Sequence, residues 1–485
     1  MTAARRRALS VSALLLLATA PVASAAAAPV PAQRLHPLRV AADGRHLLQA
    51  DGRPFFYLGD TAWALYHALT FEEADHYLRD RAAKGFTVVQ AVLLWDLDAR
   101  HVTNGVGAPL LGNDPRQPNE PYWAHVDRVI DRAAELGLTT ALLPVWGDKW
   151  HGRQSDPGTR IFRDPGSARE FARIVGRRYG SKPVVFVLGG DRNVETAEDL
   201  AITRAFGEGL KEAAPRALVS YHPRGPGRSS DALHAEPWLD FDMIQSSHTG
   251  RGIDTAANVD HDRALVPPKP TLDGEARYEA IIADFYNLGA NPAIRFDDTD
   301  ARVTAYRSLL AGAAGHTYGD NDVWQMWAPG REPQIGANTP WEEALDHPGA
   351  FQMRHLRRLF ESRPWETLAP AQDLLVGANP AGEGFVRAAM AGDRSFAFVH
   401  SPLGQPVVVD QQRLGARDVA SWWFDPRYGR AYHAHTGVGT AIQVFTPPTS
   451  GRGADWVLVL DDASRGFPPP GTPAAPDRPQ PGGSR

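Results

Sequence analysis

The stretch VVFVLGGDRN, residues 184–193, decides the fold. Its first five residues are continuously apolar and rich in valine, which predicts a strand buried on both faces, as in a parallel sheet. Gly189 and Gly190 end the strand, and Asp191 follows at once. Enzymes with α/β folds place their chemistry at the C-terminal ends of such strands. Asp191 is therefore a candidate catalytic carboxylate.

Seven further apolar runs of similar length accompany this one. They cover residues 55–60, 86–94, 138–146, 217–223, 243–248, 269–275 and 315–319. Helix-patterned segments mostly separate them, at 70–84, 121–136, 164–178, 198–213, 276–287 and 299–311. Eight short strands that alternate with helices predict an α/β fold, a (β/α)8 TIM barrel, rather than a sandwich.

The chain divides into four segments by composition. Residues 1–25 contain an arginine run, an apolar stretch and small residues, the pattern of a signal peptide, so we expect a secreted protein. Residues 34–350 form the predicted barrel domain, which begins with a short β lead-in. Alternating runs over 364–463 predict a small C-terminal all-β sandwich domain. The Pro-rich tail, 464–485, is expected to be disordered.

The composition excludes several classes of function. A formal net charge of −5 gives no electrostatic reason to expect nucleic acid or an anionic membrane as a partner. No stretch after the signal peptide is long and apolar enough to span a bilayer. The chain contains no cysteine, which excludes thiol catalysis and Cys-based zinc sites. We expect neither a cofactor nor a catalytic metal, and the oligomeric state stays open.

If the eight strands close into a barrel, the residues at their C-terminal ends share one mouth. Carboxylates, histidines and large aromatic residues gather there: Asp60, Trp63, Trp95, Trp146, Asp191, Asn193, Tyr221, His222, His248, Glu275, His316 and Tyr318. Glycoside hydrolysis requires two carboxyl groups, and aromatic rings offer flat surfaces to sugars. The pattern therefore predicts a site for a polysaccharide or oligosaccharide.

Asp191 and Glu275 are the predicted catalytic pair, because the fourth and seventh strands face each other across a barrel. One carboxyl group would protonate the leaving oxygen, and the other would attack or support the anomeric centre. This placement favours a short separation, about 5–5.5 Å, which is the retaining geometry. The other ten residues are predicted to bind substrate.

Each candidate also has a structural interpretation. An Asp after a strand often caps a helix or a turn, Glu275 could pair with Arg277 or Arg192, and Asp60 could hold the first loop. His222, His248 and His316 are metal-ligand types, but the chain lacks an HExxH motif. The acidic stretches 297–300 and 319–322 offer oxygen ligands to calcium, although neither completes an EF-hand loop.

Four motifs together resemble the apiosidase-like family, glycoside hydrolase family 140 and its relatives. They are FFYLGDTAW (55–63), VLGGDRN (187–193), LDGEARYE (272–279) and AAGHTYGDNDVWQMW (313–327). SWWFDPRYGR (421–430) and the later DWVLVLDD resemble the small domain, named as collagen-binding, that accompanies this family. The resemblance implies a (β/α)8 catalytic domain with Asp191 as acid/base and Glu275 as nucleophile. It also implies release of the branched pentose apiose from pectic side chains.

The sequence thus favours a secreted, retaining, exo-acting glycoside hydrolase that acts on polysaccharide side chains. A non-catalytic glycan- or matrix-binding protein is the alternative, suggested by the aromatic residues and the C-terminal domain. Metalloprotease activity is a third hypothesis, which rests on the naming of this domain pair and lacks a zinc motif.

Overall fold

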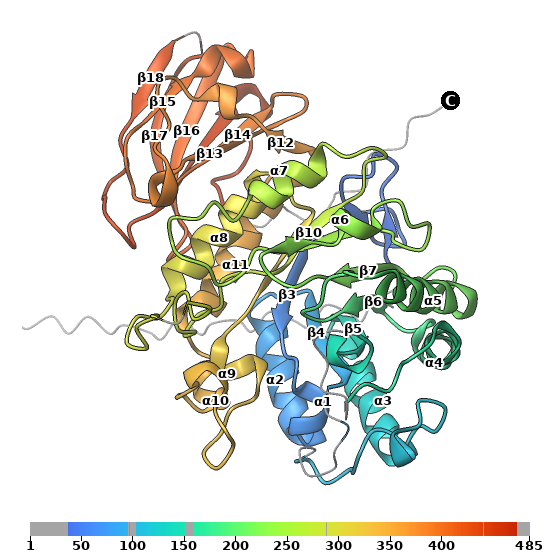
Figure 1. Cartoon of the computed structure of the whole chain (residues 1–485). Helices are drawn as coiled ribbons and strands as arrows, with labels where there is room; N and C mark the ends of the chain where they lie inside the picture. The colour runs from blue at the N-terminus through green and yellow to red at the C-terminus, as the bar shows by residue number, and fades with distance from the viewer. Residues whose placement is uncertain are drawn as a thin grey trace, which may run out of the picture.

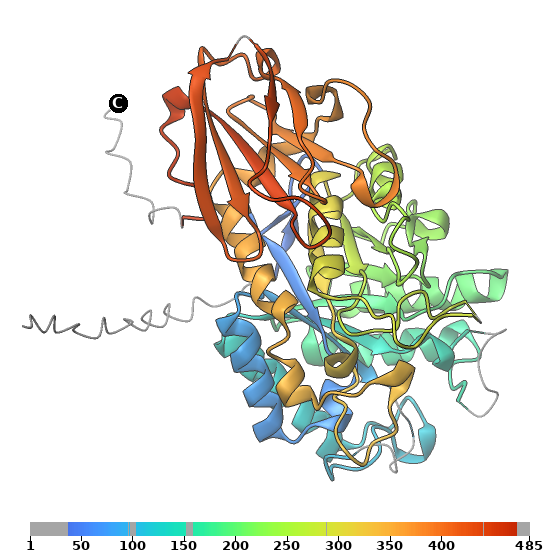
Figure 2. The same cartoon turned by 90° about the vertical axis from the view of Figure 1, so that its left-hand side faces the viewer.

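The computed structural model describes residues 37–95, 97, 103–151, 159–287, 289–439 and 441–472 (Figures 1 and 2). The predicted signal peptide and residues 473–485 of the predicted tail lie outside the described residues. None of the described helices is both long enough and apolar enough to cross a membrane.

The predicted barrel is confirmed. Eight parallel strands pair in the order β7-β6-β5-β4-β3-β11-β10-β9, and the short β8 (Gly227–Arg228) pairs antiparallel with β9 at the edge. The eight strands are β3 (Tyr57–Thr61), β4 (Val88–Leu94), β5 (Thr139–Val145), β6 (Val184–Gly189), β7 (Val219–His222), β9 (Asp242–Gln245), β10 (Thr271–Glu275) and β11 (Gly315–Tyr318). The lead-in is a hairpin of β1 (Arg39–Val40) and β2 (Leu47–Leu48).

The barrel is nearly closed at the junction of β7 and β9. No ladder joins these two strands in the described part of the chain. Instead, the backbone N–H of Asp240 donates to the carbonyl of Val219 over 2.9 Å, and the Ser220 hydroxyl donates to the carbonyl of Phe241 over 2.7 Å. The strand ends consequently share one mouth, as a TIM barrel requires.

Local sequence explains where the outer helices begin. Thr70 and Glu73 form a capping box before α2, Thr196 and Asp199 form another before α5, and Asp164 caps α4. The longer helices are α2 (Phe71–Ala83), α3 (Glu120–Glu135), α4 (Pro165–Tyr179), α5 (Ala197–Ala213), α8 (Asp298–Leu310) and α11 (Pro348–Glu361). Shorter ones are α1 (Leu65–Ala68), α6 (Ser230–Leu233), α7 (Ala257–Arg263), α9 (Asn321–Trp324) and α10 (Trp341–Ala344).

The helix predicted at 276–287 is wrong. This segment is an irregular loop that hydrogen-bonds outward: Glu279 N–H donates to Gly319 O, and Ala280 N–H donates to Phe296 O, both over 2.9 Å. Ala280 and Asp284 have φ values of +63° and +56°, which a right-handed helix cannot contain. The loop therefore belongs to the barrel mouth rather than to the outer helix layer.

The predicted C-terminal β domain is confirmed as two antiparallel sheets. The larger pairs in the order β12-β13-β14-β19-β16-β17, and the smaller joins β15 to β18. The strands are β12 (Leu368–Pro370), β13 (Arg387–Ala391), β14 (Phe396–Ser401), β15 (Val407–Asp410), β16 (Asp418–Asp425), β17 (Arg430–Val438), β18 (Ile442–Phe445) and β19 (Trp456–Asp462). Between the sheets lies an apolar cluster that includes Val399, Val409 and Trp423.

Helices α8 and α11 lie between the barrel and the β domain (Figures 1 and 2). Arg302 of α8 is fully buried and pairs with the equally buried Asp455 of the β domain, with 2.6 Å between Nη2 and Oδ1. The pair fixes the two domains together, because removing either partner would leave an uncompensated buried charge.

The predicted start of the disordered tail, residue 464, is too early, because the structure describes the chain to residue 472. Phe467 lies in the described part and packs against Phe396, with ring centroids 6.0 Å apart. The guanidinium of Arg363 sits over the same ring. A composition-based boundary misses this contact because one aromatic residue is enough to hold a Pro-rich segment against the domain.

Candidate active site

Asp191 reaches the barrel mouth through a tight left-handed turn. Gly189, Gly190 and Asp191 have φ values of +89°, +92° and +53° in succession. A β-carbon on Gly189 would lie 2.2 Å from the carbonyl oxygen of His222, and one on Gly190 would lie 2.7 Å from the Trp146 ring. The two glycines are therefore required by both backbone conformation and close packing.

Gly190→Ala should lower both stability and turnover, because the methyl group would displace Trp146 and with it the mouth. A left-handed alanine alone costs roughly 1–2 kcal/mol, and the clash adds to this. Gly105→Ala is the matched control, since Gly105 has φ +80° and a β-carbon there would meet no described atom within 4 Å. Thermal unfolding and kcat should separate the two variants; equal behaviour would contradict the packing argument.

Glu275 ends β10 at a register irregularity between Asp273 and Glu275. Its Oε1 lies 2.9 Å from Nε2 of His248, and its Oε2 lies 3.2 Å from Nε2 of His222. The backbone N–H of Tyr278 donates to Nδ1 of His248, so the proton of that imidazole sits on Nε2 and is donated to Glu275. The carboxylate is thus held from both sides.

The structure brings Asp191 and Glu275 together. One ligand atom each from Asp191, His222 and Glu275 lies within 4.8 Å of the other two. Nδ1 of His222 is 3.9 Å from Oδ1 of Asp191, so this imidazole stands between the two carboxyl groups. The Asp191 side chain remains 36% exposed, although its Oδ1 is buried, and it can therefore be reached from the mouth.

The two carboxyl groups have opposite proton affinities. Burial, and then the negative charge of Glu275, raise the pKa of Asp191 to about 7. Burial alone would also raise the pKa of Glu275, but the hydrogen bonds from His222 and His248 lower it to about 2. Burial acts to lower the pKa of His222, yet Glu275 and Asp191 together raise it. Near pH 6 the pair is therefore one carboxylic acid and one carboxylate.

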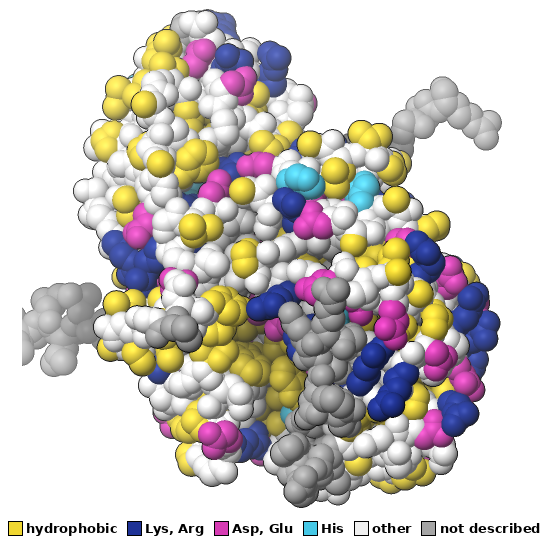
Figure 3. Space-filling model, viewed as in Figure 1, with side chains coloured by type: hydrophobic (Ala, Val, Ile, Leu, Met, Phe, Trp, Pro, Cys, Tyr) yellow, Lys and Arg dark blue, Asp and Glu magenta, His cyan; other side chains and the backbone are white. Residues whose placement is uncertain are grey.

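Aromatic side chains form one wall of the site. Trp63 packs edge-on against His222, with centroids 5.4 Å apart, and against Trp146, at 5.2 Å. Trp95 continues the wall, 4.6 Å from Trp146. Figure 3 shows a hollow below the ends of the barrel strands, walled by hydrophobic side chains, with a histidine side chain visible inside it.

The site has a second group of aromatic side chains, Phe285 and Tyr286, which the sequence analysis does not predict. His248 lies 5.7 Å from the Phe285 ring and 6.4 Å from the Tyr286 ring, and Tyr286 is 46% exposed. Both aromatic residues stand on the loop at 276–287, for which the sequence pattern predicts a helix. The turn-forming run NLGANP (287–292), directly after these two residues, is the available signal for a loop.

Four predicted substrate-binding residues lie outside the site, and the prediction is corrected for them. Asp60 is fully buried against α2, where it accepts from Tyr77 and pairs with Arg81. Tyr318 lies beside Asp60 in register, on the same side of the barrel wall. His316 and Tyr221 are likewise buried behind the wall. Successive side chains of a strand alternate between faces, so these four point to the helix layer.

The partners of these four residues lie outside the barrel mouth. The Tyr318 hydroxyl donates to Glu279, and the Tyr221 hydroxyl donates to the carbonyl of Arg192, over 2.7 and 2.6 Å. Burial lowers the pKa of His316 to about 3. Asn193 lies at the edge of the mouth, where its side-chain oxygen accepts from the backbone N–H of Arg224 and ties two loops together.

Two described clusters contain metal-ligand side chains. They are the group Asp191–His222–Glu275 at the barrel mouth and a second group, Asp320–Asp322–His347. In the second, Nδ1 of His347 lies 2.6 Å from Oδ2 of Asp320, which is hydrogen-bond geometry. The acidic residues at 297–300 have other partners: Asp297 caps α8, Asp298 pairs with Arg302, and Asp300 pairs with Arg251.

Comparison with known families shows to which family the chain belongs. The family model described as "Apiosidase-like, catalytic domain" matches residues 41–367. The chain belongs to the apiosidase-like family. This apiosidase-like chain is a glycoside hydrolase, and a second model, "Putative collagen-binding domain of a collagenase", matches its residues 369–461. No curated protein matches it.

Solved structures agree with this family membership. One structure, described as a glycoside hydrolase, is 28% identical to the apiosidase-like chain, with a TM-score of 0.81. The match covers 90% of the apiosidase-like chain and 98% of the chain in that structure. A glycoside hydrolase family 5 structure from Bacteroides vulgatus ATCC 8482 is 25% identical, covers 90% of this chain and 96% of its own, and has a TM-score of 0.82.

Proposed function

We propose that this protein is a secreted, retaining, exo-acting hydrolase that releases a terminal sugar from polysaccharide side chains. The observation that carries the proposal is the placement of Asp191 and Glu275, with oxygen atoms within 4.8 Å of each other and opposite pKa shifts. Retaining glycosidases need about 5–5.5 Å between carboxyl groups, whereas inverting ones need about 6.5–9.5 Å to admit a water.

The pKa difference supports an assignment of the two catalytic roles. Asp191, with its raised pKa, donates a proton to the leaving glycosidic oxygen as that bond breaks. Glu275, held ionised by His222 and His248, attacks the anomeric carbon and forms a glycosyl ester. Asp191 then takes a proton from water, whose oxygen attacks the same carbon and releases Glu275.

The substrate proposal rests on the family and on the two groups of aromatic side chains. Trp63 and Trp146 contact His222. Phe285 and Tyr286 contact His248, the other imidazole beside Glu275. Aromatic groups beside both imidazoles favour a pocket for a terminal sugar over an open cleft. A branched pentose of the apiose type is the first substrate to test.

The stereochemistry of the first product tests the mechanism. We expect NMR spectra recorded within minutes of adding enzyme to show a sugar of the same anomeric configuration as the aryl glycoside or oligosaccharide supplied. An inverted anomer would exclude the retaining mechanism. Hydrolysis of internal bonds in a polymer, with no release of single sugars, would exclude exo action.

A further inference from the structure

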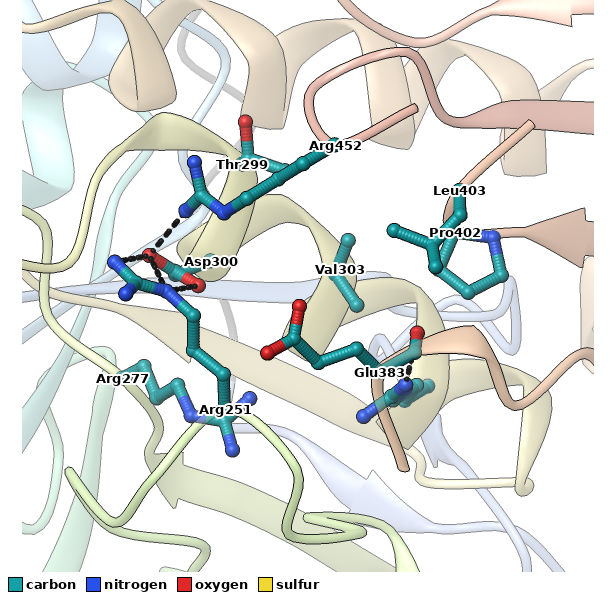
Figure 4. Close-up of a pocket in the computed structure, with 10 residues that line it drawn as sticks. Arg251, Arg277, Thr299, Asp300, Val303, Glu383, Pro402, Leu403 and Arg452 are labelled. Atoms are coloured by element: carbon teal, nitrogen blue, oxygen red, sulfur yellow. Dashed lines mark hydrogen bonds and ion pairs between the residues drawn. The ribbon is translucent and has the colours of Figure 1, made fainter. Parts of the chain in front are cut away.

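A second hollow lies where the barrel meets the β domain (Figure 4). The space between its lining residues is about 310 Å³, a volume that includes open solvent. Residues of both domains line it: Arg251, Arg277, Thr299, Asp300, Val303, Arg307, Glu383, Pro402, Leu403 and Arg452. Four of these ten side chains are guanidinium groups, which makes the hollow different in character from the aromatic active site.

The charges in this hollow do not balance. Four arginines face two carboxylates, Asp300 and Glu383, so the lining has an excess of 4 − 2 = 2 positive charges. Asp300 binds both Arg251 and Arg452, over 2.9 and 2.8 Å, as the dashed lines in Figure 4 show. Asp297 lies outside the lining and also pairs with Arg452. Asp254, also outside the lining, is the carboxylate whose charge acts most on Arg307. The excess of positive charge is thus a property of the lining itself.

Arg307 has hydrogen-bond donors without acceptors. The residue is 1% exposed, and its Nη2 donates to the carbonyls of Gly382 and Glu383 in the β domain, over 2.8 and 2.9 Å. Its Nε and Nη1 are buried and have no acceptor among the described residues. Buried donors without partners are costly, and those of a charged group are more so.

Arg277 adds a second buried guanidinium, 2% exposed. It donates to the backbone carbonyls of Thr249, Gly250 and Ile253, over 3.2, 2.7 and 3.2 Å, and to the Thr304 hydroxyl over 3.5 Å. It forms no ion pair with a described carboxylate. Burial and the neighbouring charge of Arg307 lower the pKa of Arg277 to about 10. Two largely buried like charges are thus held close together, an arrangement that an anion would stabilise.

We propose that this hollow binds a small oxyanion, with Arg277 and Arg307 as its principal ligands. Planar guanidinium groups recognise sulfate, phosphate and carboxylate through paired N–H donors. The source of the oxyanion is either a free inorganic ion or the carboxylate of an acidic sugar. The site is separate from the carboxyl pair and does not depend on the mechanism proposed above.

Glu383 has a defined part in this site. It is exposed, and its side chain forms no hydrogen bond or ion pair among the described residues, while Figure 4 shows it in the middle of the lining. Its carboxylate therefore competes with the incoming anion. Removing its charge should strengthen binding, a result that a merely structural arginine cluster would not give.

Thermal unfolding with sodium sulfate tests the proposal, with sodium chloride at equal ionic strength as the reference. At millimolar concentrations, sulfate should raise the Tm of the full-length protein along a saturable curve. Arg307→Gln should weaken this response at least about tenfold, since two charge-assisted donors are lost. Arg169→Gln, at an exposed arginine paired with Glu208 and Glu212, is the control and should respond as the wild type does.

Two further arms complete the test. Glu383→Gln should bind sulfate about three- to tenfold more tightly, and it keeps the test valid if Arg307→Gln fails to fold. The Tm shift with glucuronate, compared with that with glucose, shows whether an acidic sugar can supply the oxyanion. A Tm shift with sulfate alone identifies a free inorganic ion. The proposal is overturned if neither sulfate nor glucuronate gives a saturable shift, if Arg307→Gln responds like Arg169→Gln, or if Glu383→Gln leaves affinity unchanged.

Discussion

Glu275→Gln is expected to reduce turnover by at least about 10⁴-fold, because loss of an enzyme nucleophile typically has effects of this size or larger. Glutamine keeps the shape of the side chain and an oxygen that can accept from His248, so the fold should persist. The amide cannot form a stable glycosyl ester, so the first step fails. Initial rates on an activated aryl glycoside, with Tm and circular dichroism measured in parallel, provide the test.

Glu279→Gln is the matched control for this variant. Glu279 is also buried, only four residues further along the chain, and accepts from the Tyr318 hydroxyl and the Gly349 N–H. Burial, and then the charge of Asp320, raise its pKa to about 8, so it is largely neutral at pH 7 and an amide replaces it closely. Turnover should stay within about threefold of wild type. Activity above roughly one per cent in Glu275→Gln would remove Glu275 as the nucleophile.

The barrel could be predicted because its strands are buried on both faces. A run such as Val184–Leu188 has no polar alternation, and eight such runs in one chain fit few folds. The first residues of several helices could be predicted from single N-capping residues, such as Thr70 and Asp164. These signals are local, so one sequence contains them in full.

The site could be predicted only in part, because position at a strand end does not give the face of the strand. Asp60 and Tyr318 are adjacent in register and both point to the helix layer, although each ends a strand as convincingly as Glu275 does. The direction of a side chain at a strand end depends on the register and on irregularities, such as the one before Glu275. Such shifts have no signature in a single sequence.

The roles of the two histidines also required distances. His222 and His248 were predicted to bind substrate, yet each has a nitrogen within 3.2 Å of a Glu275 oxygen. Their position explains why the carboxyl groups of Asp191 and Glu275, close together, differ in proton affinity. Glu275 has a hydrogen bond with His248 and an ion-pair contact with His222, whereas Asp191 receives the repulsion of an ionised neighbour. The unequal contacts with the two histidines thus account for the opposite pKa shifts of the two carboxyl groups.

Asp191→Asn should lower kcat/KM for an unactivated glycoside by about 10²–10⁴-fold, the usual contribution of a general acid. It should also change the pH profile. Asp191 acts in its protonated form, so with a pKa of about 7 the wild-type rate should fall about tenfold per pH unit above pH 7. Glu275 acts ionised, and its lowered pKa keeps it so throughout mildly acidic solution, so no loss is expected there.

In Asp191→Asn the fall in rate above pH 7 should disappear, because the titrating acid is gone. A glycoside whose leaving group needs no proton, such as a dinitrophenyl glycoside, should still react quickly in the first step. Azide should then accelerate the second step, since an anion needs no general base. Asp148→Asn, at a carboxylate paired with Lys149 at the end of the neighbouring β5, should keep the wild-type pH profile. If the fall in rate above pH 7 persists in Asp191→Asn, another group is the proton donor. The next residue to replace would then be His222, because its pKa is raised and it lies beside Glu275.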